Sequence, residues 1–215
     1  MRCCFITLGC RVNQYESDAM AELLTQAGFE ITENPAEADV CIVNTCTVTN
    51  IADRKSRQML SKAHKLNPNA KLIAAGCFAQ RSPEAAAKLE GVYAVLGSAD
   101  KNRVVELVKS IAEGRENEPE SEKCNCGEKE LCDCCGGMKK FEQPENSECS
   151  GNAAGGAKIL VRDVMHEHEF EEMSAVHEGR TRAYLKIQDG CNMFCTYCAI
   201  PYARGGVRSC RSRKA

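Results

Sequence analysis

The chain has little aromatic character and no stretch suited to lipid. None of its 215 residues is Trp, and aromatic residues make up 5%. No run approaches the roughly 18 consecutive apolar residues that a membrane-spanning helix needs. The first five residues lead directly into a strand pattern and lack the basic region, apolar stretch and cleavage site of an export signal. We therefore expect a cytoplasmic protein.

Cysteine, in contrast, is abundant, with 16 residues. In a small secreted chain this number would indicate disulfides, but without an export signal a metal, a cluster or a redox role is favoured. Hydrophobic residues make up 43% of the chain, which is enough for a core, and free cysteine is itself a common core residue. We therefore expect only some of the cysteines to carry chemistry.

The net charge of −2 is the sum over three segments with very different charges. Residues 1–112 carry +1, residues 113–180 carry −9 and residues 181–215 carry +6. Such blocks indicate segments with different tasks. The basic end is suited to phosphate, although a solvated basic tail explains it equally well.

Residues 1–112 alternate strand-like and helix-like runs. Strands are expected at 5–8, 29–32, 40–43, 71–75 and 92–96, and helices at 13–27, 51–66 and 101–112. Another helix opens at Ser82, with Ser82 as its cap and Pro83 in its first turn. The alternation predicts an α/β fold, a parallel sheet with helices on both faces.

The two remaining segments break this pattern. Residues 113–180 are acidic and Cys-rich, and we interpret them as a linker or insertion with one short strand at 159–161. Residues 182–188 alternate like a strand and lead into a loop with closely spaced cysteines.

That loop carries Cys191, Cys195 and Cys198, spaced by three and two residues. Three thiolates on one short loop can bind three irons of a 4Fe–4S cluster and leave the fourth iron open. Zinc is the alternative, because Cys210 is a possible fourth ligand, but structural zinc sites prefer paired Cys-x-x-Cys units. The spacing favours the cluster.

A second set of cysteines follows from topology. Cys10, Cys46 and Cys77 each come just after an expected strand, and Gly9 and Gly76 precede two of them. In a parallel sheet the three lie along one edge, where open α/β sheets bind ligands. The glycines suit tight turns near a bulky cofactor. The alternative is three unrelated, partly buried thiols.

The other cysteines carry weaker signals. Cys3, Cys4 and Cys41 lie in or beside strands and are expected in the core. A patch in the acidic segment is suited to a soft metal ion such as zinc or copper(I), although an oxidisable insert is the favoured interpretation. The patch consists of Cys124, Cys126, Cys132, Cys134 and Cys135. The four histidines show no ligand spacing tied to a cysteine motif.

Together the two cysteine sets resemble the radical-SAM methylthiotransferase family, where SAM is S-adenosylmethionine. The matching stretches are 7–17 (TLGCRVNQYES), 44–49 (NTCTVT), 75–80 (AGCFAQ), 186–198 (KIQDGCNMFCTYC) and 200–205 (IPYARG). The resemblance implies an N-terminal methylthiotransferase domain over 1–112, a linker over 113–180, and the first strand and cluster loop of an incomplete radical-SAM barrel over 181–215.

The resemblance also implies cofactors and partners. Cys10, Cys46 and Cys77 would bind an auxiliary 4Fe–4S cluster, and Cys191, Cys195 and Cys198 the 4Fe–4S cluster that cleaves SAM. The partners would be a tRNA substrate and an electron donor such as flavodoxin or ferredoxin. Stretch 7–17 looks most like the branch that modifies threonylcarbamoyladenosine beside the anticodon. Other branches modify isopentenyladenosine in tRNA or an aspartate of a ribosomal protein.

The sequence departs from this family in its acidic, Cys-rich linker and in the absence of further barrel units after the loop. We therefore expect this polypeptide alone to be inactive or nearly so. A non-catalytic iron–sulfur or metal-binding module is the alternative function. A thiol redox protein is less suited, because residues 1–112 lack a Cys-x-x-Cys at the start of a helix.

Overall fold

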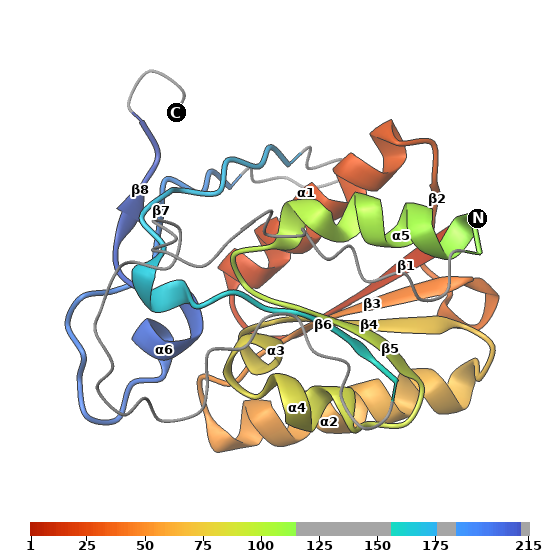
Figure 1. The fold of residues 1–215 in the computed structure, drawn as a ribbon, viewed down its shortest axis with the longest axis horizontal. Coiled ribbons are helices and arrows are strands. Elements are labelled where there is room, and N and C mark those ends of the chain that lie inside the picture. Colours follow the sequence, from red (N-terminus) through yellow and green to blue (C-terminus); the bar gives the residue numbers. More distant parts are fainter. Residues whose placement is uncertain (115–155, 176–183, 212–215) are drawn as a thin grey trace, which may run out of the picture.

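A parallel sheet forms the centre of the molecule (Figure 1). The computed structural model describes residues 1–114, 156–175 and 184–211. Within these residues the sheet has six strands in the order β2-β1-β3-β4-β5-β6, and every neighbouring pair is parallel. The strands are β1 (Arg2–Thr7), β2 (Glu30–Thr32), β3 (Val40–Thr45), β4 (Lys71–Gly76), β5 (Val92–Leu96) and β6 (Lys158–Leu160). The predicted α/β class is confirmed.

Helices cover both faces of this sheet. Figure 1 shows α1 and α5 on one face and α2, α3 and α4 on the other. The helices are α1 (Arg11–Gln26), α2 (Asn50–Leu66), α3 (Cys77–Arg81), α4 (Pro83–Ala87), α5 (Val104–Ala112) and α6 (Ile200–Arg204), with 3₁₀ turns η1 (Pro35–Glu37), η2 (Lys101–Arg103) and η4 (Val164–His166). Successive strand residues point to opposite faces. Ile42 accordingly packs in the core with Met20 of α1, and Val43 in the core with Leu60 of α2.

Local sequence signals explain most helix ends. The Thr49 side chain accepts a hydrogen bond from the Ala52 N–H at 3.1 Å and so caps α2. The helix start predicted at Ser82 is confirmed: Ser82 is the N-cap residue of α4 and Pro83 lies in its first turn, although the Ser82 side chain makes no capping hydrogen bond. One helix prediction needs correction. The helix expected over 101–112 begins as the 3₁₀ turn η2 and becomes α-helical only at Val104.

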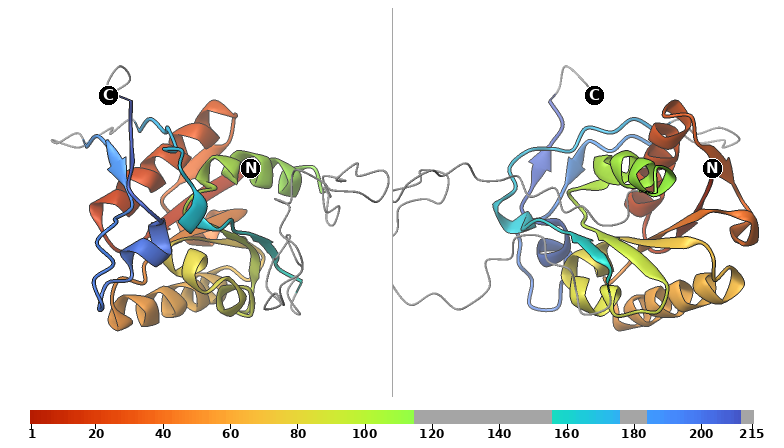
Figure 2. Two further views of the ribbon diagram at one scale, coloured as in Figure 1. Left: turned by 60° about the vertical axis from the view of Figure 1, so that its left-hand side comes forward. Right: turned by 45° about the vertical axis from the view of Figure 1, so that its right-hand side comes forward.

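Residues 156–175, which fall within the expected linker, add a strand to the sheet and then continue past its end (Figure 2). The short strand predicted near 159–161 is confirmed as β6, which pairs with β5 at the sheet edge. Further along, Arg162 Nε donates to Asp100 Oδ1 at 2.6 Å, and the Tyr15 hydroxyl donates to the Met173 carbonyl at 2.6 Å. Residues 156–175 therefore pack as part of the α/β unit, while the predicted boundaries of the segment stay predictions.

Residues 184–211 pack at one end of the sheet. They form the short antiparallel pair β7 (Gln188–Asp189) and β8 (Arg208–Ser209), and α6 packs against α3 and η4. The strand expected over 182–188 is wrong for 184–187, which are irregular and pair with no neighbouring strand in the described residues. No helix in the described residues is long and apolar enough to span a membrane.

Candidate functional site

The carboxyl ends of three neighbouring strands each lead to a cysteine. Cys10 follows β1 and precedes α1, Cys46 follows β3 directly, and Cys77 is the first residue of α3 after β4. Because β1, β3 and β4 are adjacent and parallel, the three cysteines lie along one edge, as predicted. We call them the edge cysteines. Cys46 and Cys77 are buried, at 4% and 1% exposure, whereas Cys10 is exposed.

Two glycines allow the backbone turns at this edge. Gly9 has φ +98° and Gly76 has φ +90°, values that side-chain-bearing residues rarely adopt. A Cβ on Gly9 would lie 2.8 Å from Cys46 Sγ, and one on Gly76 would lie 2.3 Å from Asn44 Oδ1. Glycine at both positions is therefore required by backbone conformation and by space, which confirms the predicted tight turns.

Asn13 connects the edge cysteines. Its Nδ2 donates to the carbonyls of Leu8 and Thr45, both at 2.9 Å, which fixes the amide and directs Oδ1 the other way. Oδ1 lies 3.8 Å from Cys10 Sγ and 4.0 Å from Cys77 Sγ, where each thiol donates to it. One amide oxygen therefore faces thiols from two different strand ends.

Asn13 contacts a buried group of charges centred on Glu16. Arg204 binds this carboxylate in bidentate fashion, with Nη1–Oε1 2.9 Å and Nη2–Oε2 3.1 Å. Lys101 Nζ lies 3.2 Å from Oε2, and Lys186 Nζ lies 2.7 Å from Oε1. Arg204 also donates to Asn13 Oδ1 at 2.7 Å, so the charges contact the residue that faces the thiols.

Asp189 is the second carboxylate of this group. It receives Arg204 Nη1 at 2.9 Å and Lys186 Nζ at 2.7 Å, and Arg208 Nη2 lies 3.9 Å away. We call these two carboxylates and four cations the buried charge network; its members are Glu16, Lys101, Lys186, Asp189, Arg204 and Arg208. Their side chains come from α1, η2, the 184–187 segment, β7, α6 and β8, so the network joins residues 184–211 to the sheet domain.

Electrostatics in the network favour the charged forms. Burial alone would raise the pKa of Glu16, but the Arg204, Lys101 and Lys186 charges outweigh it and hold that pKa well below its ordinary value. Burial opposes the charge of Arg204, yet Glu16 and its other anionic neighbours raise the Arg204 pKa. Glu16 and Arg204 therefore stay charged at neutral pH. Burial raises the pKa of the Cys77 thiol, while the Arg204 charge acts in the opposite direction.

The second cysteine set lies on the loop between β7 and α6. Cys191 and Cys198 are partly buried and Cys195 is exposed. The Cys191 N–H donates to the Gly205 carbonyl at 3.0 Å, and the Cys198 N–H donates to the Cys195 carbonyl at 2.9 Å. The helix that follows the loop, α6, packs against α3, which begins at Cys77.

The edge suits a negatively charged sulfur-ligated group better than a single metal ion. In the described residues, no three His, Cys, Asp or Glu side chains are close enough to hold one ion. A cubane cluster separates its ligands more widely than one ion does, so this finding concerns mononuclear sites only. In the described residues, the buried charge network carries four cations and two carboxylates, and its Arg204 contacts Asn13, which faces the Cys10 and Cys77 sulfurs. These features fit a cluster, whose ligation by the edge cysteines stays a prediction.

The other predicted cysteines divide into two groups. Cys3, Cys4 and Cys41 are buried in the sheet, which confirms the core prediction, and burial raises the pKa of Cys3 to about 11. The patch of five cysteines between 124 and 135 lies outside the described residues. Cys210, the possible zinc ligand, follows β8, and its N–H donates to the Ile187 carbonyl at 2.8 Å.

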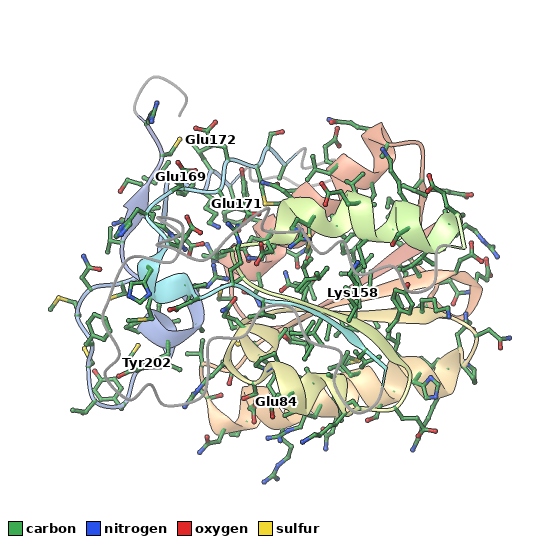
Figure 3. The ribbon with its side chains drawn as sticks, in the orientation of Figure 1. Glu84, Lys158, Glu169, Glu171, Glu172 and Tyr202 are labelled. Carbon is green, nitrogen blue, oxygen red and sulfur yellow. The ribbon has the colours of Figure 1, made fainter. Side chains whose placement is uncertain are left out.

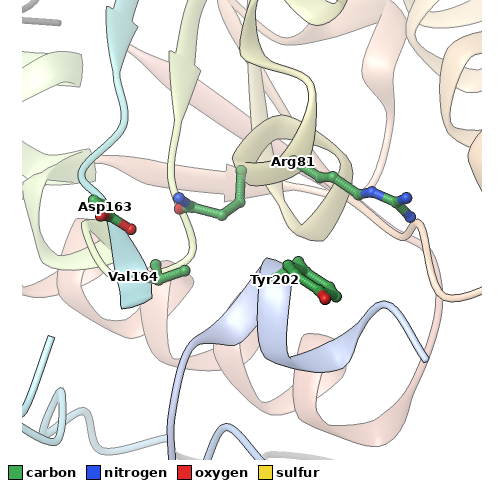
Figure 4. Close-up of a pocket in the computed structure, with 5 residues that line it drawn as sticks. Arg81, Asp163, Val164 and Tyr202 are labelled. Atoms are coloured by element: carbon green, nitrogen blue, oxygen red, sulfur yellow. The ribbon is translucent and has the colours of Figure 1, made fainter. Parts of the chain in front are cut away.

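Two cavities lie near the site without including a cysteine. One, of about 430 Å³, is lined by Gln80, Arg81, Asp163, Val164 and Tyr202 (Figure 4). The other, of about 400 Å³, includes Glu169, Glu171 and Glu172, which lie close together in Figure 3. Carboxylates repel phosphate, so the second cavity is a poor surface for nucleic acid.

Sequence reasoning found the cysteines but assigned no role to the buried charge network. Asn13, Glu16, Lys186, Asp189 and Arg204 all lie within the stretches that carry the family resemblance, which is the signal that could have identified them. Lys101 lies outside those stretches, and nothing in its local sequence indicates that it is fully buried.

The sequence of this chain is similar to a family model and to several known proteins. Residues 2–97 match the model of the Uncharacterized protein family UPF0004. Over 211 residues the chain is 35% identical to the threonylcarbamoyladenosine tRNA methylthiotransferase MtaB of Aquifex aeolicus, covering 97% of this chain and 42% of that protein. Over 206 residues it is 36% identical to the MtaB protein of Bacillus subtilis, covering 95% and 37%.

A relative with another substrate in its name also matches. The ribosomal protein uS12 methylthiotransferase RimO of Chloroflexus aurantiacus is 30% identical over 205 residues, which cover 95% of this chain and 39% of that protein. The chain thus spans well under half the length of these curated relatives. The stretches read from the sequence and the matches agree: over nearly its whole length, the chain is similar to the N-terminal part of methylthiotransferases.

Proposed function

We propose that this chain contributes the cofactor-binding portion of a tRNA methylthiotransferase that modifies N6-threonylcarbamoyladenosine beside the anticodon by radical-SAM chemistry. The observation that carries the proposal is the convergence of Cys10, Cys46 and Cys77 at the carboxyl ends of three adjacent parallel strands. The names of the Aquifex aeolicus and Bacillus subtilis relatives support the substrate branch.

The residues have separable roles in this proposal. Cys10, Cys46 and Cys77 would hold one 4Fe–4S cluster, and Cys191, Cys195 and Cys198 a second that leaves one iron open to SAM. When bound, these groups would supply the electron, the radical, the sulfur and the methyl group. The protein positions them and excludes water: burial of Cys46 and Cys77 shields the edge, and Gly205 fixes the loop through the Cys191 N–H.

The partners follow from the same chemistry. A reductive SAM cleavage needs an electron donor, for which flavodoxin or ferredoxin is suited, and the proposed substrate is tRNA. A tRNA-modifying role would place the protein in the cytoplasm.

The test uses a chimera, because the chain spans 37% of the Bacillus subtilis relative. The chain would replace the matched 206 residues of that relative, and the chimera would be expressed in cells lacking their own enzyme of this kind. Mass spectrometry of digested tRNA should then show the methylthio form of threonylcarbamoyladenosine, and a Cys10→Ala chimera should not produce it. A folded, iron-loaded chimera that leaves this nucleoside unmodified would contradict the proposal.

The alternative function, a non-catalytic iron–sulfur or metal-binding module, requires no tRNA. It would be favoured if the chimera bound iron at the edge cysteines and formed neither methylthiolated tRNA nor 5′-deoxyadenosine from SAM, while the intact relative formed both.

A further inference from the structure

The buried charge network has an excess of positive charge that its own carboxylates do not balance. In the described residues, the ion pairs of the four cations Lys101, Lys186, Arg204 and Arg208 are with Glu16 and Asp189. On the side away from Asn13, Asp189 and Arg208 also line the cavity that contains Glu169, Glu171 and Glu172. The Lys101 side chain is fully buried and the other three cations are about 5% exposed. Uncompensated buried charge is costly, so a network of this kind needs an anion nearby.

On the Asn13 side of the network, the edge cysteines can supply negative charge. Asn13 Oδ1 lies 2.7 Å from Arg204 Nη2 on one side and within 4.0 Å of the Cys10 and Cys77 sulfurs on the other. When those thiols ionise to bind metal, they stop donating to Oδ1. The partly negative Asn13 Oδ1 then faces two thiolates. The Arg204 guanidinium, which donates to the same oxygen, offsets the resulting repulsion.

We propose that the network, with Arg204 as its positioning residue, supports the edge cysteines in two ways: Arg204 holds Asn13 between Cys10 and Cys77, and the excess positive charge stabilises the reduced form of a cluster bound there. This inference rests on the proposed function, in which the edge cysteines bind a 4Fe–4S cluster. Cluster potentials depend on nearby net charge, hydrogen bonds and exposure, and a nearby cation raises them.

Substitutions at two different residues test the two contributions, the contact with Asn13 and the positive charge, separately. Arg204 contacts Asn13 and supplies charge, whereas Lys186 contacts Glu16 and Asp189 and makes no hydrogen bond with Asn13. Arg204→Lys retains the charge but cannot bind Asn13, Glu16 and Asp189 at once, because lysine lacks the planar fork. Lys186→Met removes a charge and leaves the Asn13 contact in place.

The test is made in the Cys195→Ala chain, to leave the edge cysteines as the iron site. After anaerobic reconstitution, iron per chain and the midpoint potential are measured for Arg204→Lys, Arg204→Met and Lys186→Met. Arg2→Met is the matched control, because Arg2 is half-exposed at the opposite end of β1, where it pairs with Glu37. It changes net charge without touching the network.

We expect Lys186→Met to keep its iron and to have a lower potential than Arg2→Met. Arg204→Lys should lose iron with little change in the potential of what remains, and Arg204→Met should show both effects. Equal potential and iron content in Lys186→Met, Arg204→Lys and Arg2→Met would overturn the inference while leaving the cluster intact. If Arg204→Met fails to fold, Lys186→Met and Arg204→Lys decide. A Cys195→Ala parent without iron would instead refute the proposed function, and this inference with it.

Discussion

Glycines at the strand ends allow the tight turns that bring the edge cysteines to one edge of the sheet. Gly9 is one of them, because its φ of +98° and the nearby Cys46 both exclude a side chain. Gly28 has a similar φ of +89°, but nothing lies within 4 Å of the place where its Cβ would be. A comparison of substitutions at Gly9 and Gly28 therefore distinguishes the cost of backbone strain, which both positions share, from the cost of a steric clash, which occurs only at Gly9.

We predict that Gly28→Ala lowers the free energy of unfolding by about 1–2 kcal/mol, the cost of a left-handed backbone for alanine. Gly9→Ala should cost more, because it also displaces Cys46, and it should reduce the iron retained after reconstitution. Denaturant titration and iron analysis measure the two effects. Equal losses of stability with unchanged iron would show that Gly9 does not shape the edge.

Glu16 makes stability depend on pH. Its pKa in the folded state is lowered below the ordinary value of 4.5, so the stabilisation is complete above that value and is lost as pH falls below it. We predict that the metal-free chain loses stability on acidification below about pH 4.5, and that Glu16→Gln makes this dependence shallower.

At pH 7 the same substitution should lower the free energy of unfolding by about 3–5 kcal/mol, because it leaves buried cations without their partner. Glu84→Gln, at an exposed position, is the control and should change stability by less than about 0.5 kcal/mol. The account of Glu16 fails if the wild type and Glu16→Gln show the same dependence on pH in denaturant titrations.

At the scale of elements, helix starts that look equivalent in sequence differ in the structure. Thr49 and Ser82 both occupy cap positions, but only the Thr49 hydroxyl accepts a hydrogen bond from the helix it precedes. We predict that Thr49→Ala costs about 1 kcal/mol of stability and Ser82→Ala much less. Thermal or denaturant unfolding of both variants checks this, and a larger loss in Ser82→Ala would contradict it.

The sequence predicted the central elements well for a physical reason. Strands buried on both faces, such as β3, are continuous apolar runs that few other structures produce. The incorrect strand prediction at 184–187 also has a physical reason. There the apolar Leu185 and Ile187 are 65% and 56% exposed, while Lys186 is buried with Glu16 and Asp189. An alternating pattern cannot indicate that its polar residue points inward to a distant ion pair.

At the scale of the whole molecule, the two cysteine sets belong to one packed unit. Arg204 follows the Cys191–Cys198 loop, binds Glu16 of α1 and donates to Asn13, and α6 packs against the helix that begins with Cys77. The sequence predicted the two sets separately. Their connection depends on contacts between residues 188 positions apart, which no local pattern encodes.

The central claim is that the two sets bind two separate 4Fe–4S clusters. Its most direct test is iron and acid-labile sulfide per chain after anaerobic reconstitution, with electron paramagnetic resonance spectra. The wild type, Cys10→Ala and Cys195→Ala would be compared with Cys3→Ala, a buried strand cysteine, as the control. We predict about eight irons per chain in the wild type and in Cys3→Ala, and about half in each of the other variants. Iron content that is absent, or unchanged by Cys10→Ala and Cys195→Ala, would contradict the claim.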